Sequence, residues 1–162
     1  MNVSKPTVLA QSLVDRLIEK GWHISFAESC TGGMAAAGIV DVASASAVLN
    51  ESFVTYANSA KIRYLGVSPE TIDQHGVVSE PVALEMARGV AKAAGAEVGV
   101  GISGIAGPSG GTATKPVGMV CFGFWINGEG FAKTIQFGNI GRNNVRQESV
   151  DFVYTTLLEQ LN

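Results

Sequence analysis

The chain has 162 residues, of which 46% are hydrophobic and 15% are charged, and its formal net charge is −3. This composition supplies a core for one compact domain over residues 1–162 and argues against a disordered chain. The sequence also contains no run of Lys and Arg for binding nucleic acid, no apolar stretch of about 20 residues for crossing a membrane, and no Cys and His spacing for zinc. We therefore expect a cytoplasmic domain that holds no metal.

Hydrophobic periodicity and turn residues predict helices and strands that alternate along the chain. Helices are expected over 6–20, from Ser29-Cys30-Thr31 to about 40, and over 58–66, 68–76, 79–95 and 142–161. Strands are expected over 23–27, 51–56 and 97–103 and on both sides of Asn127-Gly128. Asn58, Ser68 and Ser79 are the expected N-caps. The pattern predicts a three-layer α/β/α sandwich on a mixed sheet with a C-terminal β-hairpin.

Large apolar side chains occur along both strands of the expected hairpin, at Phe122, Phe124, Trp125 and Phe131. Because neighbouring residues of a strand point to opposite faces, these side chains occupy both faces of the hairpin. One face is expected to pack under helices. The other is either covered within the monomer or meets a second copy of the chain, and the pattern favours a homo-oligomer.

Three polar or glycine-rich segments follow predicted strands. They are "ESCTGG", "TYANSAK" and "SGIAGPSGGTATKP". Since ligands of open α/β sheets bind outside the carboxyl ends of the strands, we expect these segments to border one site.

The first segment offers three candidate nucleophiles, Ser29, Cys30 and Thr31, at the start of a helix. Either Ser29 or Thr31 only caps the helix, or one of the three attacks a substrate while free backbone N–H groups hold an anion. A catalytic Cys30 needs a cationic partner, and neither His23 nor His75 lies in a motif that points to this role. A serine needs a base.

The second segment contains a candidate base, Lys61, five residues after Tyr56. A lysine kept neutral by burial can take a proton from serine, and Tyr56 can relay that proton or position the lysine. The alternatives are a solvated helix lysine and an aromatic side chain that covers the core at a strand end.

The third segment is rich in glycine, and its amides and hydroxyls suit a phosphate, a ribose or an amide oxygen. A turn-rich crossover is the alternative explanation. Lys115, Arg142 and Arg146 either add positive charge near this loop or are ordinary surface charges.

Four motifs carry a family resemblance: "AESCTGG", "FVTYANSAK", "QHGVVSEPVALEMA" and "GISGIAGPSGGTATKPVG". Their order and separation closely resemble the C-terminal domain family of the competence/damage-inducible protein CinA, whose stand-alone form is a nicotinamide-nucleotide amidohydrolase. The resemblance runs from about Gln11 to Leu158. It implies a three-layer α/β fold and hydrolysis of nicotinamide mononucleotide (NMN) to nicotinate mononucleotide and ammonia, in pyridine-nucleotide salvage. It also implies that no metal or organic cofactor is used.

The resemblance also implies roles for individual residues. The serine, tyrosine and lysine of the family fall on Ser29, Tyr56 and Lys61, so Ser29 is the expected nucleophile and the other two form the base system. Further residues are expected to bind the substrate: Cys30, Thr31, Gly32, Gly33, Ser103, Gly104, Ile105, Ala106, Gly107 and Arg142.

One turn departs from the family pattern. The family has a compact F-x-G-[DN]-R turn before the last helix, whereas this chain has "FGNIGR" over residues 137–142, with one more residue and no acidic side chain. This difference motivates an alternative, a catalytically inactive relative that binds a nucleotide or a partner. A third reading is an amidase that acts on a non-phosphorylated amide.

Overall fold

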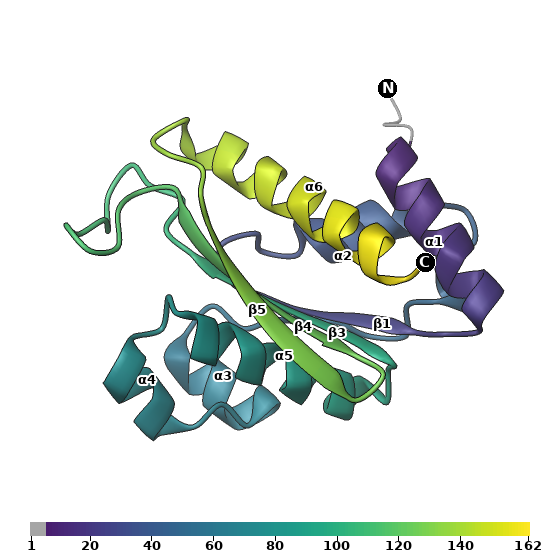
Figure 1. The fold of residues 1–162 in the computed structure, drawn as a ribbon, viewed down its shortest axis with the longest axis horizontal. Coiled ribbons are helices and arrows are strands. Elements are labelled where there is room, and N and C mark those ends of the chain that lie inside the picture. The colour runs from purple at the N-terminus through teal and green to yellow at the C-terminus, as the bar shows by residue number, and fades with distance from the viewer. Residues whose placement is uncertain (1–5) are drawn as a thin grey trace.

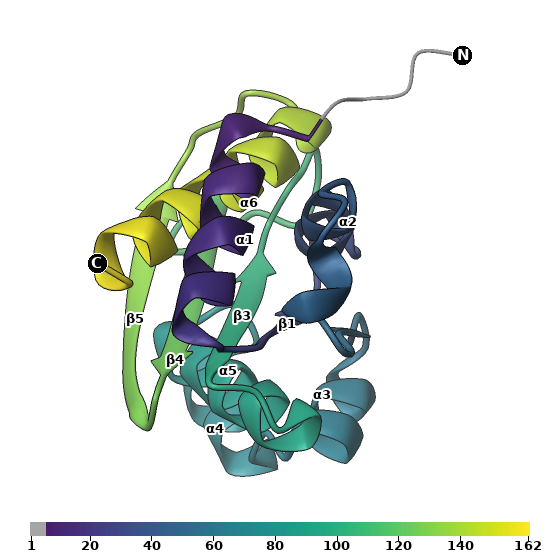
Figure 2. The same ribbon diagram turned by 90° about the vertical axis from the view of Figure 1, so that its right-hand side faces the viewer.

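A computed structural model describes residues 6–162 as a five-stranded sheet between two layers of helices (Figure 1). In chain order the elements are α1 (Val8–Lys20), β1 (Ile24–Glu28), α2 (Met34–Val40), the short 3-10 helix η1 (Ala45–Ala47), β2 (Phe53–Val54), α3 (Asn58–Leu65), α4 (Pro69–His75), α5 (Glu80–Ala94), β3 (Val98–Gly104), β4 (Met119–Ile126), β5 (Glu129–Gln136) and α6 (Arg142–Gln160). Helices α1, α2 and α6 cover one face of the sheet, and α3, α4 and α5 cover the other (Figures 1 and 2). The expected three-layer sandwich is confirmed.

The sheet is mixed, with the strand order β2-β1-β3-β4-β5. Strand β1 runs parallel to β2 and β3, while β4 runs antiparallel to β3 and β5. Because β1, β2 and β3 point the same way, their carboxyl ends meet at one edge of the sheet. The three segments singled out in the sequence begin there.

Strand β2 is shorter than the sequence predicts, with two residues instead of 51–56. Side chains replace the missing backbone ladder. The Ser25 hydroxyl donates to the Glu51 carbonyl at 2.7 Å, and the Phe26 amide donates to Ser52 Oγ at 3.0 Å. These contacts keep the edge segment beside β1 and so fix where residues 55 and 56 leave the sheet.

The hairpin of β4 and β5 turns at Asn127-Gly128, as expected. The φ angles of Asn127 and Gly128 are 48° and 92°, so both residues adopt the left-handed conformation that a type I′ turn requires.

Each of the four aromatic residues of the hairpin is either buried or packed against another side chain of the chain, and Trp125 and Phe131 stay partly exposed. Phe122 and Phe124 are buried, and Phe131 stacks on Phe124 with ring centroids 4.9 Å apart. The Arg88 guanidinium of α5 lies 5.4 Å from the ring centroid of Trp125. These contacts account for the aromatic pattern, and a homo-oligomer stays a prediction.

Helix α5 lies directly on the backbones of β3 and β4. A Cβ atom at Gly101 would lie 2.2 Å from the Ala83 carbonyl oxygen, and one at Gly123 would lie 2.0 Å from the same atom. Only glycine permits this approach. The close packing places the middle of β3 directly against α5.

The helix starts agree with the sequence at two of the three expected caps. Ser79 precedes α5 and its hydroxyl accepts from the Val82 amide, and Ser68 precedes α4. The expectation for Asn58 is wrong, because Asn58 is already helical and the extended residue at the N-cap is Ala57. Within residues 6–162, no helix is long and apolar enough to cross a membrane.

Candidate active site

Ser29 and Lys61 meet at the carboxyl edge of the parallel strands. Ser29 directly follows β1, and Lys61 lies in the first turn of α3. The Lys61 Nζ atom is 3.4 Å from Ser29 Oγ, 2.6 Å from the Thr55 carbonyl oxygen and 3.3 Å from the Tyr56 carbonyl oxygen. The lysine side chain is only 1% exposed. It is therefore not a solvated helix lysine.

Burial changes the chemistry of Lys61. The loss of hydration lowers the pKa of its amino group from the ordinary value of 10.5, and the Cys30 thiol opposes this shift to a smaller extent. Backbone carbonyls, which carry no net charge, are its principal partners. The neutral form that a general base requires is thus favoured relative to a lysine in water.

The Tyr56 side chain lies away from this pair. The residue is 64% exposed, and its phenol oxygen accepts from Arg142 Nη2 at 3.3 Å. Only the backbone carbonyl of Tyr56 reaches Lys61. The structure brings Tyr56 to the site, but among residues 6–162 no hydrogen bond links its phenol to Ser29 or Lys61.

Sequence reasoning missed Glu28, the residue before Ser29. Its carboxylate is 1% exposed and accepts three backbone N–H groups at the start of α2, from Gly33 at 3.0 Å, Ala35 at 3.1 Å and Ala36 at 2.9 Å. A negative charge at a helix N-terminus is favourable, and this was the available signal. The alternative in which Ser29 or Thr31 caps the helix is wrong, because α2 begins only at Met34 and Glu28 accepts its amides.

A tight turn separates Ser29 from α2. The Gly32 amide donates to the Ser29 carbonyl at 3.0 Å, and Gly32 and Gly33 have φ angles of 59° and 101°, which favour glycine. The Gly32 amide donates to Ser29 and the Gly33 amide donates to Glu28. The amides of Cys30 and Thr31, in the same turn, donate to no group among residues 6–162.

Two arginines of α6 reach loops at this edge. Arg146 donates from Nε to the Cys30 carbonyl at 2.9 Å and from Nη2 to the Thr31 carbonyl at 3.2 Å. Arg142 donates from Nη1 to the Gly107 carbonyl at 2.8 Å while Nη2 contacts Tyr56. Despite its different sequence, the turn over 137–142 therefore brings Arg142 to the expected site.

The glycine-rich segment divides into structural and site-facing parts. The buried Ser103 hydroxyl donates to the Val77 carbonyl at 2.8 Å, and the Ile105 amide donates to the Met119 carbonyl at 2.9 Å. A Cβ atom at Gly104 would lie 2.7 Å from a methyl group of Val120. These contacts hold the loop to its neighbours, and substrate binding by these three residues stays a prediction.

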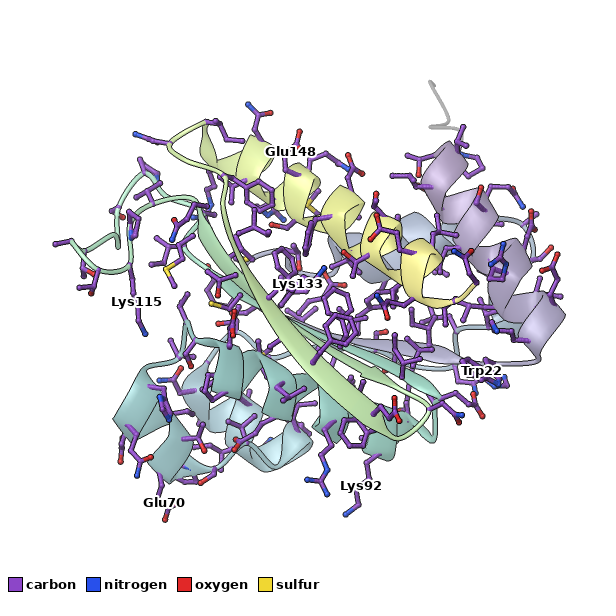
Figure 3. The ribbon with its side chains drawn as sticks, viewed as in Figure 1. Trp22, Glu70, Lys92, Lys115, Lys133 and Glu148 are labelled. Atoms are coloured by element: carbon purple, nitrogen blue, oxygen red, sulfur yellow. The ribbon has the colours of Figure 1, made fainter. Side chains whose placement is uncertain are left out.

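The remainder of this loop lies nearer the arginines. Gly107 contacts Arg142, and the amides of Ala106 and Gly107 donate to no group among residues 6–162. Lys115 instead extends toward α4, where its Nζ donates to the His75 carbonyl at 2.5 Å (Figure 3).

Cys30 has the properties of a packing residue. Its thiol is buried, and burial is the main reason that its pKa is raised to about 11. The thiolate that a cysteine nucleophile requires is therefore scarce at neutral pH. Of the three candidates, Ser29 is the one whose side chain contacts a base.

Two hollows lie away from the Ser29–Lys61 pair. One of about 580 Å³ lies between α3 and α5, and another of about 210 Å³ lies among α1, α2 and α6. Neither hollow is lined by Ser29 or Lys61. The candidate active site is therefore identified from the contact between these two side chains and not from a cavity. Residues 6–162 contain no group of three or more His, Cys, Asp and Glu side chains arranged to hold a metal ion.

Comparison with known proteins gives one family. The model of the CinA C-terminal domain matches residues 6–161. A CinA-like protein of Kosmotoga olearia is 47% identical over 153 residues, which is 93% of this chain but 37% of that protein. The chain thus spans little more than a third of that relative, and it spans 35% of a putative competence-damage inducible protein of Alkaliphilus oremlandii.

Other relatives match along nearly their whole length. The nicotinamide-nucleotide amidohydrolase PncC of Escherichia coli K12 is 45% identical over 161 residues, covering 99% of this chain and 97% of that protein. The crystal structure of a competence-damaged protein (CinA) superfamily protein from Enterobacter cloacae has a TM-score of 0.93 at 33% identity, covering 100% of this chain and 95% of that one.

Proposed function

This chain belongs to the CinA C-terminal domain family, and on that premise we propose that it hydrolyses the carboxamide of NMN to nicotinate mononucleotide and ammonia. The observation that carries the proposal is the buried Lys61 beside Ser29, with Nζ 3.4 Å from Oγ. Relatives named as nicotinamide-nucleotide amidohydrolases, 45% and 50% identical over most of their length, support the choice of substrate.

The first step is attack by Ser29. A neutral Lys61 amine has two N–H donors, which the carbonyls of Thr55 and Tyr56 accept, and its lone pair is then left to face Ser29 Oγ. As Lys61 takes the hydroxyl proton, Oγ bonds to the carboxamide carbon, and the carbonyl oxygen becomes an oxyanion. In this proposal the proton passes directly, without the Tyr56 phenol.

The following steps return the enzyme to its starting state. Protonated Lys61 gives its proton to the departing nitrogen, which leaves as ammonia, and the nicotinoyl group stays on Ser29 as an ester. Lys61 then deprotonates a water molecule that attacks the ester, which releases nicotinate mononucleotide and restores the Ser29 hydroxyl.

The unoccupied amides suggest where the oxyanion binds. Backbone N–H groups aimed at a developing negative charge stabilise the transition state of acyl transfer. The amides of Cys30 and Thr31 adjoin Ser29, whereas those of Gly32 and Gly33 already donate within the protein. The amides at the N-terminus of α2 thus donate to the Glu28 carboxylate and are not free to bind the oxyanion.

The substrate phosphate is proposed to bind near Arg142. This guanidinium joins Gly107 to Tyr56 across the edge of the site, and the neighbouring amides of Ala106 and Gly107 are unoccupied by residues 6–162. A cation beside free amides suits a phosphate.

The test is ammonia release from NMN by the purified protein and by its Ser29→Ala variant. We expect release by the wild type and a fall of about 10³-fold or more in the variant, because the nucleophile is lost. Near-normal hydrolysis by Ser29→Ala would contradict the assignment. Tight NMN binding without ammonia would favour the inactive binding relative, and faster release from nicotinamide or nicotinamide riboside would favour the non-phosphorylated substrate.

A further inference from the structure

We propose that Arg146 is a positioning residue, which orients the peptide group between Cys30 and Thr31 so that the Thr31 N–H faces the oxyanion formed at Ser29. The inference rests on the proposed function, because it requires an acyl-transfer step at Ser29. Arg146 itself touches neither Ser29 Oγ nor Lys61 through any hydrogen bond of residues 6–162, so it acts through the backbone.

Arg146 holds two successive carbonyl groups from one side. Its Nε donates to the Cys30 oxygen at 2.9 Å and its Nη2 donates to the Thr31 oxygen at 3.2 Å, while Nη1 donates to Asn143 Oδ1 at 3.0 Å. A Cβ atom at Gly32 would lie 3.5 Å from Nη2, so the guanidinium packs closely against the turn. All three nitrogens of the planar guanidinium are engaged, which fixes its orientation.

Because Arg146 binds these two carbonyls, the geometry of the peptide group determines where the neighbouring N–H groups point. In a trans peptide the N–H points opposite to the C=O of the same planar group. Since Arg146 binds the Cys30 carbonyl, the Thr31 N–H points away from Arg146. The next peptide follows the same rule, because its carbonyl, that of Thr31, binds Arg146 while its Gly32 N–H donates to the Ser29 carbonyl at 3.0 Å. The side opposite Arg146 is therefore the side on which the Ser29 carbonyl lies, and the proposal places the oxyanion there.

The turn over residues 29–32 places the Thr31 amide two residues after the nucleophile. In a four-residue turn of this kind, a hydroxyl side chain on the first residue approaches the amide two residues on. Thr31 is fully buried, yet its amide donates to no group among residues 6–162. A buried polar group without a partner calls for an explanation, and a donor reserved for an oxyanion provides one.

The positive charge of Arg146 also favours binding of the oxyanion by the Thr31 N–H. A cation on a carbonyl oxygen polarises the peptide group and strengthens its N–H as a donor, more so where the effective dielectric constant is low. Lys61, by contrast, binds the carbonyls of Thr55 and Tyr56. The neutral amine of Lys61 thus serves proton transfer, and the cationic Arg146 serves the oxyanion.

The primary experiment compares Arg146→Met and Arg146→Lys with Arg16→Met as the matched control. Arg16 also donates to a backbone carbonyl, that of Leu161 at 3.0 Å, but from α1 to the end of the chain. We expect Arg146→Met to lower kcat for NMN by about 10- to 100-fold with little change in KM, since the donor acts in the transition state. Arg146→Lys retains part of the activity, and Arg16→Met retains kcat.

A second readout does not depend on NMN. A fluorophosphonate reacts when Ser29 Oγ bonds to phosphorus, fluoride leaves, and the hydroxyl proton passes to the base. Its phosphoryl oxygen occupies the oxyanion position. We expect the rate constant for labelling Ser29 to fall in Arg146→Met and to stay unchanged in Arg16→Met. If Arg146→Met does not fold, the labelling rate of Arg146→Lys tests the proposal instead, and a rate equal to that of the wild type would contradict it.

The outcomes separate the two proposals. A folded Arg146→Met variant with wild-type kcat and labelling rate, or with a change in KM alone, overturns the role of Arg146. Labelling of a wild-type protein that releases no ammonia from NMN refutes the proposed substrate, and the labelling rates of the variants still test Arg146. If the wild type shows neither reaction, Ser29 is not a nucleophile and both proposals fail.

Discussion

Lys61 meets Tyr56 at the backbone, with Nζ 3.3 Å from the Tyr56 carbonyl oxygen, while the phenol of the same residue contacts Arg142. The tyrosine side chain is therefore not needed to hold the lysine. Any side chain at position 56 supplies the carbonyl, and the Lys61 amine reaches Ser29 without an intermediary.

This geometry predicts a mild effect for Tyr56→Phe. The variant keeps the carbonyl and loses only the phenol oxygen that accepts from Arg142. We expect kcat to fall about tenfold or less, with KM for NMN rising because Arg142 loses a partner. Steady-state kinetics beside Ser29→Ala measure this. A loss in kcat as large as that of Ser29→Ala would show that the phenol relays the proton.

Lys61→Arg is predicted to abolish most of the activity while keeping the positive charge. A guanidinium does not lose its proton at neutral pH, so it cannot accept one from Ser29. The expected fall in kcat is about 10²- to 10⁴-fold, the usual contribution of a general base. Retained turnover in this variant would exclude Lys61 as the base.

The pH dependence of kcat/KM is a separate test of Lys61. Because the neutral amine is the active form, the rate rises with pH through the pKa of Lys61. Burial lowers that pKa from 10.5, so the rise has its midpoint below 10.5. We expect the residual activity of Lys61→Arg to lack this rise. An identical rise in wild type and variant would assign it to another group.

Lys61 also links stability to pH. Its pKa is lower in the folded than in the unfolded protein, so between the two values the unfolded state binds more protons, and the free energy of unfolding rises with pH. Below the folded-state pKa the cost of burying the charge is fully present. Urea unfolding over a pH series should show this rise in the wild type and not in Lys61→Met, and parallel curves would contradict it.

Cys30 is predicted to be dispensable for catalysis. Burial raises the pKa of its thiol to about 11, and among residues 6–162 no hydrogen bond joins the thiol to a base. Cys30→Ala should keep kcat close to wild type, and iodoacetamide at neutral pH should leave Cys30 of the folded protein unmodified by mass spectrometry. Labelling in urea is the control. Inactivation of the enzyme through Cys30 would reverse this assignment.

The sequence predicted the features that depend on local patterns. Periodicity gives the order of helices and strands, and Asn127-Gly128 specifies its own turn. The convergence of the three loop segments follows from parallel pairing, which alternating helices and strands imply. The pairing of Ser29 with Lys61 could be predicted because Ser29 directly follows β1 and Lys61 lies in the helix that follows β2, the strand beside β1.

The features that the sequence did not predict depend on tertiary distance or on a helix boundary. Arg146 is 116 residues from Cys30, and only the docking of α6 beside α2 joins them. Glu28 caps α2 because the Gly32-Gly33 turn delays the helix to Met34, and the helical pattern itself does not mark that delay.

Glu28→Gln is predicted to weaken both the fold and the site. The carboxylate accepts three amides, and an amide side chain in its place puts an NH₂ group against some of these donors. The free energy of unfolding should fall by about 1–3 kcal/mol, the cost of buried donors without partners. Because the Ser29 turn is held between Glu28 and Arg146, kcat should fall as well. Urea unfolding and ammonia release measure the two effects.

Glu85→Gln is the matched control for this prediction. Glu85 also accepts a backbone N–H near a helix start, from Ser68 at 2.9 Å, together with the Thr71 hydroxyl at 2.7 Å, but it lies on α5 between α4 and the sheet. It should lose stability and keep kcat. If both variants lost stability equally and both kept kcat, Glu28 would be a helix cap without influence on Ser29. A fall in kcat confined to Glu28→Gln would show that the buried carboxylate sets the geometry of the nucleophile turn.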